Sequence, residues 1–106
     1  METYVILTKL SADSFHDPAE FPQTAHTVAA KIKAQCPDVV WKESYALMGR
    51  FDVLDVIEAP SRQMAEQAAM LIRAYGHATT ETLAATPWKQ FLRELSSQRE
   101  TTGARR

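Results

Sequence analysis

The stretch DVVWKESYALMGRFDVLDVIEA, from Asp38 to Ala59, decides the fold, because it reads as two β-strands folded back on each other at Gly49-Arg50. Both runs are rich in β-branched and aromatic side chains, which suit a pleated, half-buried surface. The first run contains Val39, Val40, Trp41, Tyr45 and Leu47, and the second contains Phe51, Val53, Leu54, Val56 and Ile57. A two-residue loop that begins with glycine is typical of a type II′ turn. The stretch therefore predicts a β-hairpin.

Pairing the two strands outward from the turn places Met48 opposite Phe51 and Trp41 opposite Glu58. Because side chains alternate along a strand, the hairpin has two faces. One face carries Trp41, Glu43, Tyr45, Leu47, Asp52, Leu54, Val56 and Glu58, and the other carries Val40, Lys42, Ser44, Ala46, Met48, Phe51, Val53, Asp55 and Ile57. Large apolar residues occur on both faces, whereas a sheet with one wet side alternates cleanly. We therefore expect both faces to be covered.

The rest of the chain supplies the other elements of an α+β fold. Before the hairpin we expect a strand at 3–10, a loose turn at 17–21 and a helix from Pro22 to Cys36. After the hairpin we expect a helix with Ser61 as its N-cap and Gly76 as its C′ residue, and then a strand at 79–85. A last helix follows Thr86-Pro87 and carries the apolar stripe Trp88, Phe91, Leu92 and Leu95. This order, β-α-β-β-α-β plus a C-terminal helix, is that of the ferredoxin-like fold with an antiparallel sheet. We expect a single domain over 1–95 and a mobile tail over 96–106.

The expected topology leaves one face of the sheet bare. Both crossover connections have the same hand, so both helices are expected on one side of the sheet. The opposite face then has no cover within the chain, although its residues are partly apolar. Self-association through that face, as a homodimer or a larger assembly of dimers, is the simplest way to remove it from water.

Composition narrows the class of protein. The chain has 106 residues, 45% hydrophobic and 24% charged, with a net charge of −1, which argues against a nucleic-acid or anionic-membrane partner. No apolar run approaches the length of a bilayer span, and no secretory signal is recognised, so the expected compartment is the cytoplasm. The single cysteine, Cys36, excludes an intramolecular disulfide and a cysteine-based zinc site. His16, His26 and His77 do not share metal-ligand spacing, and we expect neither a metal nor a cofactor.

One set of side chains could line a pocket. Trp41, Glu43 and Tyr45 share a face of the hairpin, with the aromatic rings as walls and the carboxylate as a polar anchor. Glu81, on the last strand, and His77, at the entry to that strand, are two further ligand-binding candidates. The competing interpretation is that Trp41 and Tyr45 are core or interface aromatics, that Glu81 is a solvated strand residue and that His77 is a surface residue.

The acidic residues of the hairpin favour structural roles. Asp52 and Glu58 share a face but lie about 20 Å apart along the strand. Asp55 points the other way, so paired acid–base chemistry within one chain is disfavoured. Asp52 is expected to bind a backbone N–H beside the turn, and Asp55 to form a cross-strand polar pair with Ser44. Cys36, on the helix stripe, is expected to be a buried, inert thiol.

A longer pattern resembles a known family. MGRFDVLDVIEAP at 48–60, the helix from Ser61 to Tyr75, TTETL at 79–83 and the opening TYVILTKL at 3–10 together resemble the GYD domain family of small bacterial proteins. Gly49, Phe51 and Asp52 stand at the positions of the family's glycine–tyrosine–aspartate signature, with phenylalanine in place of tyrosine. The resemblance covers Thr3 to Thr86 and implies a ferredoxin-like fold of the dimeric α/β-barrel type. It implies no particular activity, and a tyrosine hydroxyl has no counterpart at Phe51.

Three classes of function follow from these observations. The first is a small self-associating domain that holds a small molecule between subunits. The second, by fold analogy only, is a cofactor-independent enzyme of the dimeric α/β-barrel type, an oxygenase or isomerase. The third is a structural or regulatory binding module. A cavity lined by Trp41, Tyr45 and a carboxylate would favour a ligand, whereas a filled, dry interface would favour the module.

Overall fold

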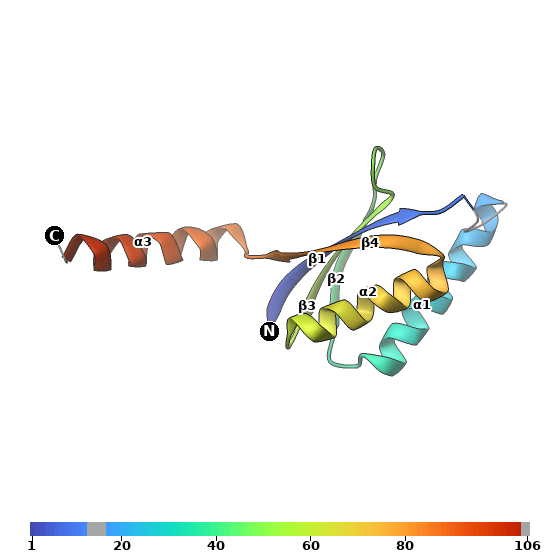
Figure 1. Ribbon diagram of the computed structural model, residues 1–106, viewed down its shortest axis with the longest axis horizontal. Coiled ribbons are helices and arrows are strands. Elements are labelled where there is room, and N and C mark those ends of the chain that lie inside the picture. Colours follow the sequence, from blue (N-terminus) through green and yellow to red (C-terminus); the bar gives the residue numbers. More distant parts are fainter. Residues whose placement is uncertain (13–16, 105–106) are drawn as a thin grey trace.

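The computed structural model describes residues 1–12 and 17–104, with the side chains of 98–104 left undescribed. Its elements, in chain order, are β1 (Glu2–Leu10), the 3₁₀ helix η1 (Pro18–Glu20), α1 (Phe21–Gln35), β2 (Val40–Ala46), β3 (Val53–Ala59), α2 (Arg62–Gly76), β4 (Ala78–Ala85) and α3 (Trp88–Ala104). The predicted ferredoxin-like order with a C-terminal helix is therefore confirmed (Figure 1). The expectation for His16 lies outside the described residues, and so does the part of the expected tail at 105–106.

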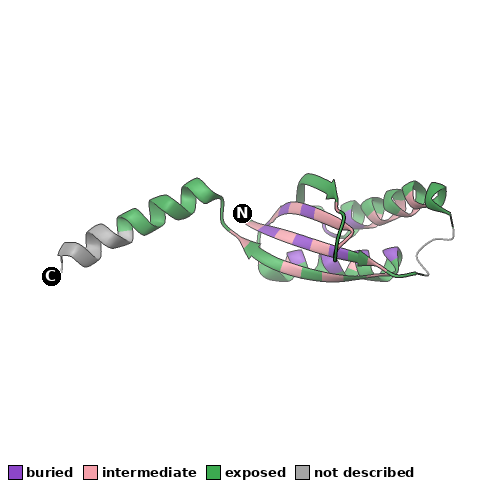
Figure 2. Cartoon of the chain, turned by 90° about the horizontal axis from the view of Figure 1, so that it is seen from above, coloured by how far each residue is buried: buried purple, intermediate pink, exposed green. Residues whose placement is uncertain are grey.

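The four strands form one antiparallel sheet in the order β2-β3-β1-β4. α1 and α2 lie on one face of this sheet (Figure 1). Burial alternates along the central strands, as the banding in Figure 2 shows. The side chains that face the helices form the core, which consists of Tyr4, Ile6, Ile32, Cys36, Ile57, Ala59, Ala65, Ala68, Ala69 and Ile72.

The two helices differ in how closely they approach the sheet. α2 turns three buried alanines, Ala65, Ala68 and Ala69, toward the core and packs on β1, β3 and β4. Small side chains allow that close approach. α1, by contrast, packs on α2 and on η1, and its backbone comes close to none of the described strands. Space is therefore left between α1 and the β2–β3 side of the sheet.

Helix termini follow the sequence signals with small differences. The Ser61 hydroxyl accepts a hydrogen bond from the Met64 backbone N–H at 3.3 Å, which confirms Ser61 as the N-cap of α2. The predicted C′ position of Gly76 is wrong, because Gly76 is the last helical residue and His77 adopts the left-handed conformation (φ 51°, ψ 56°). Gly76 is buried beside α1, with Val28 next to it, so the helix continues one residue further into the core before it reverses.

The hairpin turn is longer than predicted. β2 ends at Ala46 and β3 begins at Val53, so Met48 and Phe51 are not paired and no two-residue type II′ turn forms. The last rung is a 2.8 Å bond from the Leu47 backbone N–H to the Asp52 carbonyl. Beyond it the chain opens into a loop in which Gly49 has φ +136° and Met48 is fully exposed. Asp52 also bonds to the other neighbouring strand, because its own N–H donates to the Thr8 carbonyl of β1 at 2.8 Å.

The predicted register of β2 is wrong at its start, because β2 contains a β-bulge between Trp41 and Glu43. Pairs from Ala46–Val53 to Glu43–Val56 are as predicted, but Trp41 pairs with Ile57 rather than Glu58, and the extra residue is Lys42. A one-residue insertion moves every side chain beyond it to the other face. The prediction that Trp41 shares a face with Glu43 and Tyr45 is therefore wrong, because Trp41 faces the helices. Lys42 forms an ion pair with Glu58 at 3.9 Å.

None of the described helices covers the opposite face of the sheet, as predicted from the topology (Figure 1). This side of the sheet, which we call the open face, carries large apolar side chains from all four strands, namely Val5, Leu7, Val40, Tyr45, Leu54, Val56 and Leu83. α3 leaves the end of β4 and extends away from the sheet (Figure 1), and the molecule measures 62 Å along its longest axis. No helix within the described residues is long and apolar enough to cross a membrane.

Candidate functional site

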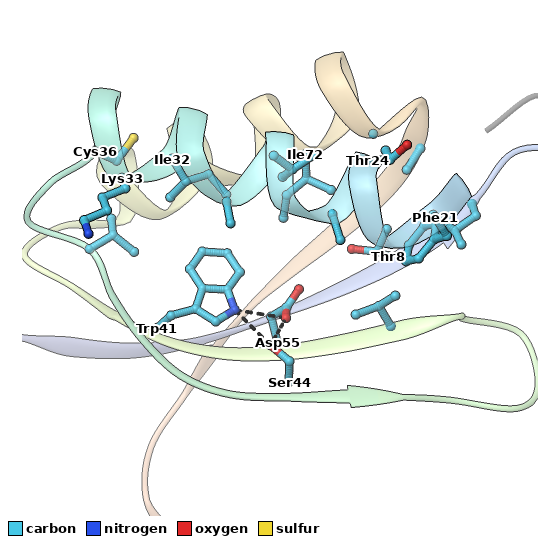
Figure 3. Close-up of a pocket in the computed structure, with 18 of the residues that line it drawn as sticks. Thr8, Phe21, Thr24, Ile32, Lys33, Cys36, Trp41, Ser44, Asp55 and Ile72 are labelled. Carbon is cyan, nitrogen blue, oxygen red and sulfur yellow. Dashed lines mark hydrogen bonds between the residues drawn. The ribbon is translucent and has the colours of Figure 1, made fainter. Parts of the chain in front are cut away.

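A cavity of about 780 Å³ fills the space between α1 and the sheet (Figure 3). Because α1 rests on α2 rather than on the strands, the side chains of β2 and β3 beneath it have no helix seated directly upon them. The residues that line the cavity are Thr8, Leu10, Phe21, Thr24, Ala25, Val28, Ala29, Ile32, Lys33, Cys36, Pro37, Val39, Trp41, Ser44, Tyr45, Ala46, Val53, Asp55, Ile72, Gly76 and Ala78. Most of them are apolar, so the walls suit a hydrocarbon or aromatic surface.

Three polar side chains form a linked group on the floor of the cavity. The Trp41 indole N–H donates to Ser44 Oγ at 3.0 Å and to Asp55 Oδ1 at 3.1 Å, and the Ser44 hydroxyl donates to the same Asp55 oxygen at 2.5 Å (Figure 3). The Ser44–Asp55 pair predicted from the sequence is therefore confirmed. Asp55 is only 7% exposed, and none of its described hydrogen bonds uses the second carboxylate oxygen, Oδ2.

A second polar atom in the cavity lacks a partner. Thr8 is 3% exposed, and its hydroxyl forms no hydrogen bond with any residue that the structure describes. Thr8 lies opposite Val53 on β3, which makes Asp55 its diagonal neighbour on the same face. Diagonal neighbours lie about 7–8 Å apart. A buried hydroxyl without a partner costs about 1–3 kcal/mol, and a ligand atom could remove that cost.

Two charged or nucleophilic residues complete the wall near the end of α1. Cys36 is buried, and burial raises the pKa of its thiol, so the thiol is protonated at neutral pH. The thiolate is the nucleophilic form of cysteine. The predicted burial is confirmed, and the raised pKa supports an inert thiol. Lys33 is exposed and lies at the edge of the cavity (Figure 3), where it supplies a positive charge beside the opening.

Similarity to known proteins places this fold and motif in a family. The sequence profile of the GYD domain matches residues 4–95. The chain belongs to the GYD domain family. No curated protein is similar enough to match the chain.

Solved structures share the fold of this GYD domain. One is the Mycobacterium tuberculosis leucine response regulatory protein LrpA, with 13% identity, a TM-score of 0.57, and coverage of 81% of this chain and 51% of that one. FFRP-DM1 has 25% identity and a TM-score of 0.52 over 81% and 100% of the two chains. The hypothetical protein PHS023 from Pyrococcus horikoshii has 24% identity and a TM-score of 0.50 over 82% and 92%. The GYD domain thus spans about half the length of LrpA.

The signature residues of the GYD domain hold the fold together outside the cavity. The Asp52 carboxylate accepts a 2.7 Å hydrogen bond from the Leu10 backbone N–H, as predicted for a residue beside the turn. Gly49 supplies a backbone conformation that other residues rarely adopt. Phe51, in the tyrosine position, lies under the Arg50 guanidinium, 5.3 Å from the ring centre. None of the three lines the cavity.

The residues predicted to bind a ligand are divided between two faces of the sheet. Trp41 lies in the cavity, whereas Glu43, Tyr45 and Glu81 project from the opposite face, on β2 and β4. Tyr45 touches the cavity wall, but it alternates with Ser44 and so directs its ring to the open face. There a hydrogen bond to the Glu43 carboxylate raises the pKa of the Tyr45 phenol. His77 is exposed beyond the end of α2. Their role in binding a ligand stays a prediction.

Sequence reasoning missed the residues that give the cavity its polar character. Thr8 has no predicted role beyond its place in the strand at 3–10, and the predicted role of Asp55 is only a cross-strand pair with Ser44. The available signal was that Asp55 shares a predicted face with Val53 and Ile57, where a carboxylate needs hydrogen-bond donors. No group of three or more His, Cys, Asp or Glu side chains among residues 1–12 and 17–97 could hold a metal ion.

Proposed function

We propose that this GYD domain binds a small, mainly apolar molecule that carries a hydrogen-bond-donating head group. The observation that carries the proposal is a buried carboxylate, Asp55, in an apolar cavity of about 780 Å³. Ligand sites typically enclose about 300–1,000 Å³ and combine apolar walls with a few convergent polar groups. We place the ligand beneath α1 rather than between subunits, because the cavity, Trp41 and the carboxylate all lie on the helix side.

The polar floor determines which head group fits. A buried carboxylate is costly unless donors satisfy it, and Trp41 and Ser44 satisfy only one of its two oxygens. No ion pair joins Asp55 to a lysine or arginine among the described residues. An amine, in its charged form, or an alcohol would supply the missing donor to Oδ2. The Thr8 hydroxyl can accept a second hydrogen bond or donate one to the same head group.

Binding fits the cavity better than catalysis does. No histidine among residues 1–12 and 17–97 lines the cavity, and the protonated Cys36 thiol is not a nucleophile. A cofactor-independent oxygenase or isomerase remains the runner-up, with Asp55 as its general base. It rests on fold analogy and not on a set of residues with catalytic geometry. Binding without turnover of the bound molecule distinguishes the two.

A homologous series of probes tests the binding proposal. Octylamine, octanol and octanoate share one apolar chain and differ in the head group. We expect octylamine to bind most tightly and octanoate most weakly, because the carboxylate of octanoate would lie against Asp55. Isothermal titration calorimetry gives the three dissociation constants. Leucine is a further probe, because the name of the leucine response regulatory protein suggests it and because leucine carries an ammonium group that can donate to Asp55.

Three variants assign the binding to the cavity. Asp55→Asn keeps the shape of the side chain but removes its charge, and should weaken octylamine binding at least tenfold, or about 1.4 kcal/mol. Thr8→Val removes the unpartnered hydroxyl without changing the volume. Glu81→Gln is the matched control, because it removes a carboxylate from the opposite face of the sheet. Equal affinity of the wild type and the Asp55→Asn protein for octylamine would contradict the proposal.

We also propose that the domain self-associates through its open face. Tyr45 and Leu83 are exposed there, and Val5, Leu7, Leu54 and Val56 are only partly buried. Burial of side chains of this size contributes about 1.5–3 kcal/mol each. Several of them together can offset the entropy lost on association. A homodimer is the smallest assembly that covers this face.

A further inference from the structure

α3 packs on no other helix or strand that the structure describes. Its residues 88–97 are exposed, and Figure 2 shows this part of the helix in the colour of exposed residues. Yet Trp88, Phe91, Leu92 and Leu95 form an apolar stripe at helical spacing, and they are 40–69% exposed. A helix that is amphipathic but packs on nothing is marginal in water. The stripe therefore needs a surface that the single chain does not supply.

The stripe is an integral part of the domain. The GYD domain profile matches residues 4–95, so it ends at Leu95, the last residue of the stripe. The Trp88 and Phe91 rings already pack on each other, with centroids 5.8 Å apart, and present one continuous aromatic surface. Both features indicate that the first two turns of α3 belong to the working form of the domain.

The open face and the α3 stripe are complementary in charge as well as in polarity. Glu43 and Glu81 lie at the two sides of the open face, on β2 and β4. At about 100° per residue, Lys89 lies on one flank of the stripe and Glu94 on the other, whereas Gln90 and Arg93 lie on the far side. A helix that lies across the open face, with the Lys89 flank toward Glu43 or Glu81, would bring this cation toward a carboxylate while its apolar stripe covers the centre.

We infer that the α3 helix of each copy lies across the open face of a second copy, in a reciprocal exchange. This inference rests on the proposed self-association and names the segment that mediates it. Direct packing of one sheet on another would cover the open face but leave the stripe in water, whereas the exchange covers both. Because each copy has one stripe and one open face, a two-fold arrangement closes the assembly at a dimer.

The connection to α3 favours exchange over folding back onto the same chain. Only Thr86 and Pro87 separate β4 from α3. α3 continues away from the sheet beyond the end of β4 (Figure 1). Proline fixes its own φ and restricts the residue before it to extended conformations, so this short connection resists a sharp reversal. A second copy can accept the helix without any such reversal.

Substitutions on the two sides of α3 test the exchange. Phe91→Ser combined with Leu92→Ser removes the middle of the stripe, and should weaken dimerisation at least tenfold in sedimentation equilibrium of the full chain. Gln90→Ser combined with Glu94→Ser is the matched control on the polar side and should leave the dimer unchanged. Far-ultraviolet circular dichroism checks that the sheet domain stays folded. An unchanged dimer in the stripe variant, with association lost only on Leu83→Ser, would overturn the exchange but preserve the proposed self-association.

Cross-linking distinguishes exchange from the other arrangements. One chain carries Glu81→Cys and the other Glu94→Cys, both with Cys36→Ala, and the two are mixed and treated with a short bismaleimide. Exchange predicts cross-linked dimers that contain one chain of each kind. Cross-links between two Glu94→Cys chains would instead indicate pairing of α3 with α3, and cross-links between two Glu81→Cys chains would indicate direct sheet packing. Monomers linked internally in a chain that carries both substitutions would indicate folding back. Each of these three results overturns the inference.

Discussion

The Asp52 carboxylate accepts a 2.7 Å hydrogen bond from the backbone N–H of Leu10, beyond the last β1–β3 pair in register, Thr8 with Val53. The Asp52 backbone N–H donates in turn to the Thr8 carbonyl at 2.8 Å. This one residue therefore continues the pairing of β1 past the end of β3. The fold explains the place of Asp52 in the family signature, because its carboxylate accepts the Leu10 N–H of β1 where β3 no longer supplies a backbone acceptor.

Loss of this carboxylate should destabilise the domain. Asp52→Ala is expected to lower the free energy of unfolding by about 1–3 kcal/mol, because the Leu10 N–H would lose a charged acceptor. Urea unfolding followed by circular dichroism gives the value. Asp52→Asn is the control, because its amide oxygen can still accept and should recover part of the loss. Equal midpoints for the wild type and Asp52→Ala would show that the bond contributes nothing.

Gly49 should tolerate no β-branched residue. Its φ of +136° lies in a region that L-residues rarely adopt, although a Cβ placed there would meet no atom within 4 Å. Gly49→Val is therefore expected to cost more than about 1 kcal/mol through backbone strain alone. Met48→Val is the matched control, because Met48 is adjacent, fully exposed and not at positive φ. Two variants of equal stability would show that the loop relaxes around the new side chain.

Burial of Cys36 should make the free energy of unfolding fall as the pH rises into the alkaline range. Burial raises the pKa of the folded thiol, so its contribution to stability is fully present below the unfolded pKa of about 8.5 and is lost as the pH rises through the folded pKa. We expect the free energy of unfolding to fall as the pH is raised from about 8 toward 10. Cys36→Ala, although less stable overall, should show a flatter profile. A parallel fall in both proteins would assign the effect to other groups.

Self-association should be evident at micromolar concentration. The apolar residues of the open face, including Tyr45 and Leu83, lie against water in a single chain. Sedimentation equilibrium at about 10 μM is expected to give at least twice the monomer mass of 11.9 kDa, because burial of several such side chains offsets the cost of association. A clean monomer at that concentration would rule out the proposed interface while leaving the binding proposal for the cavity untouched.

Local sequence patterns determined the order of the elements and most of the hairpin. Counting outward from Gly49-Arg50 gave the pairs Tyr45–Leu54 and Ser44–Asp55 correctly, and alternation with a period of two placed these pairs on opposite faces of the hairpin. The Ser61 cap and the bare face of the sheet were also predictable, since capping is local and the hand of the crossovers is general.

Tertiary structure alone decided where Trp41 lies and where the cavity forms. A single extra residue at Lys42 reverses the face of Trp41, and the two oxygens that its indole N–H reaches, on the exposed Ser44 and the buried Asp55, come from two strands. The cavity exists because α1 rests on α2 and not on the strands. Neither feature has a signature in the local sequence, because each depends on how distant segments share one core and satisfy their polar atoms within it.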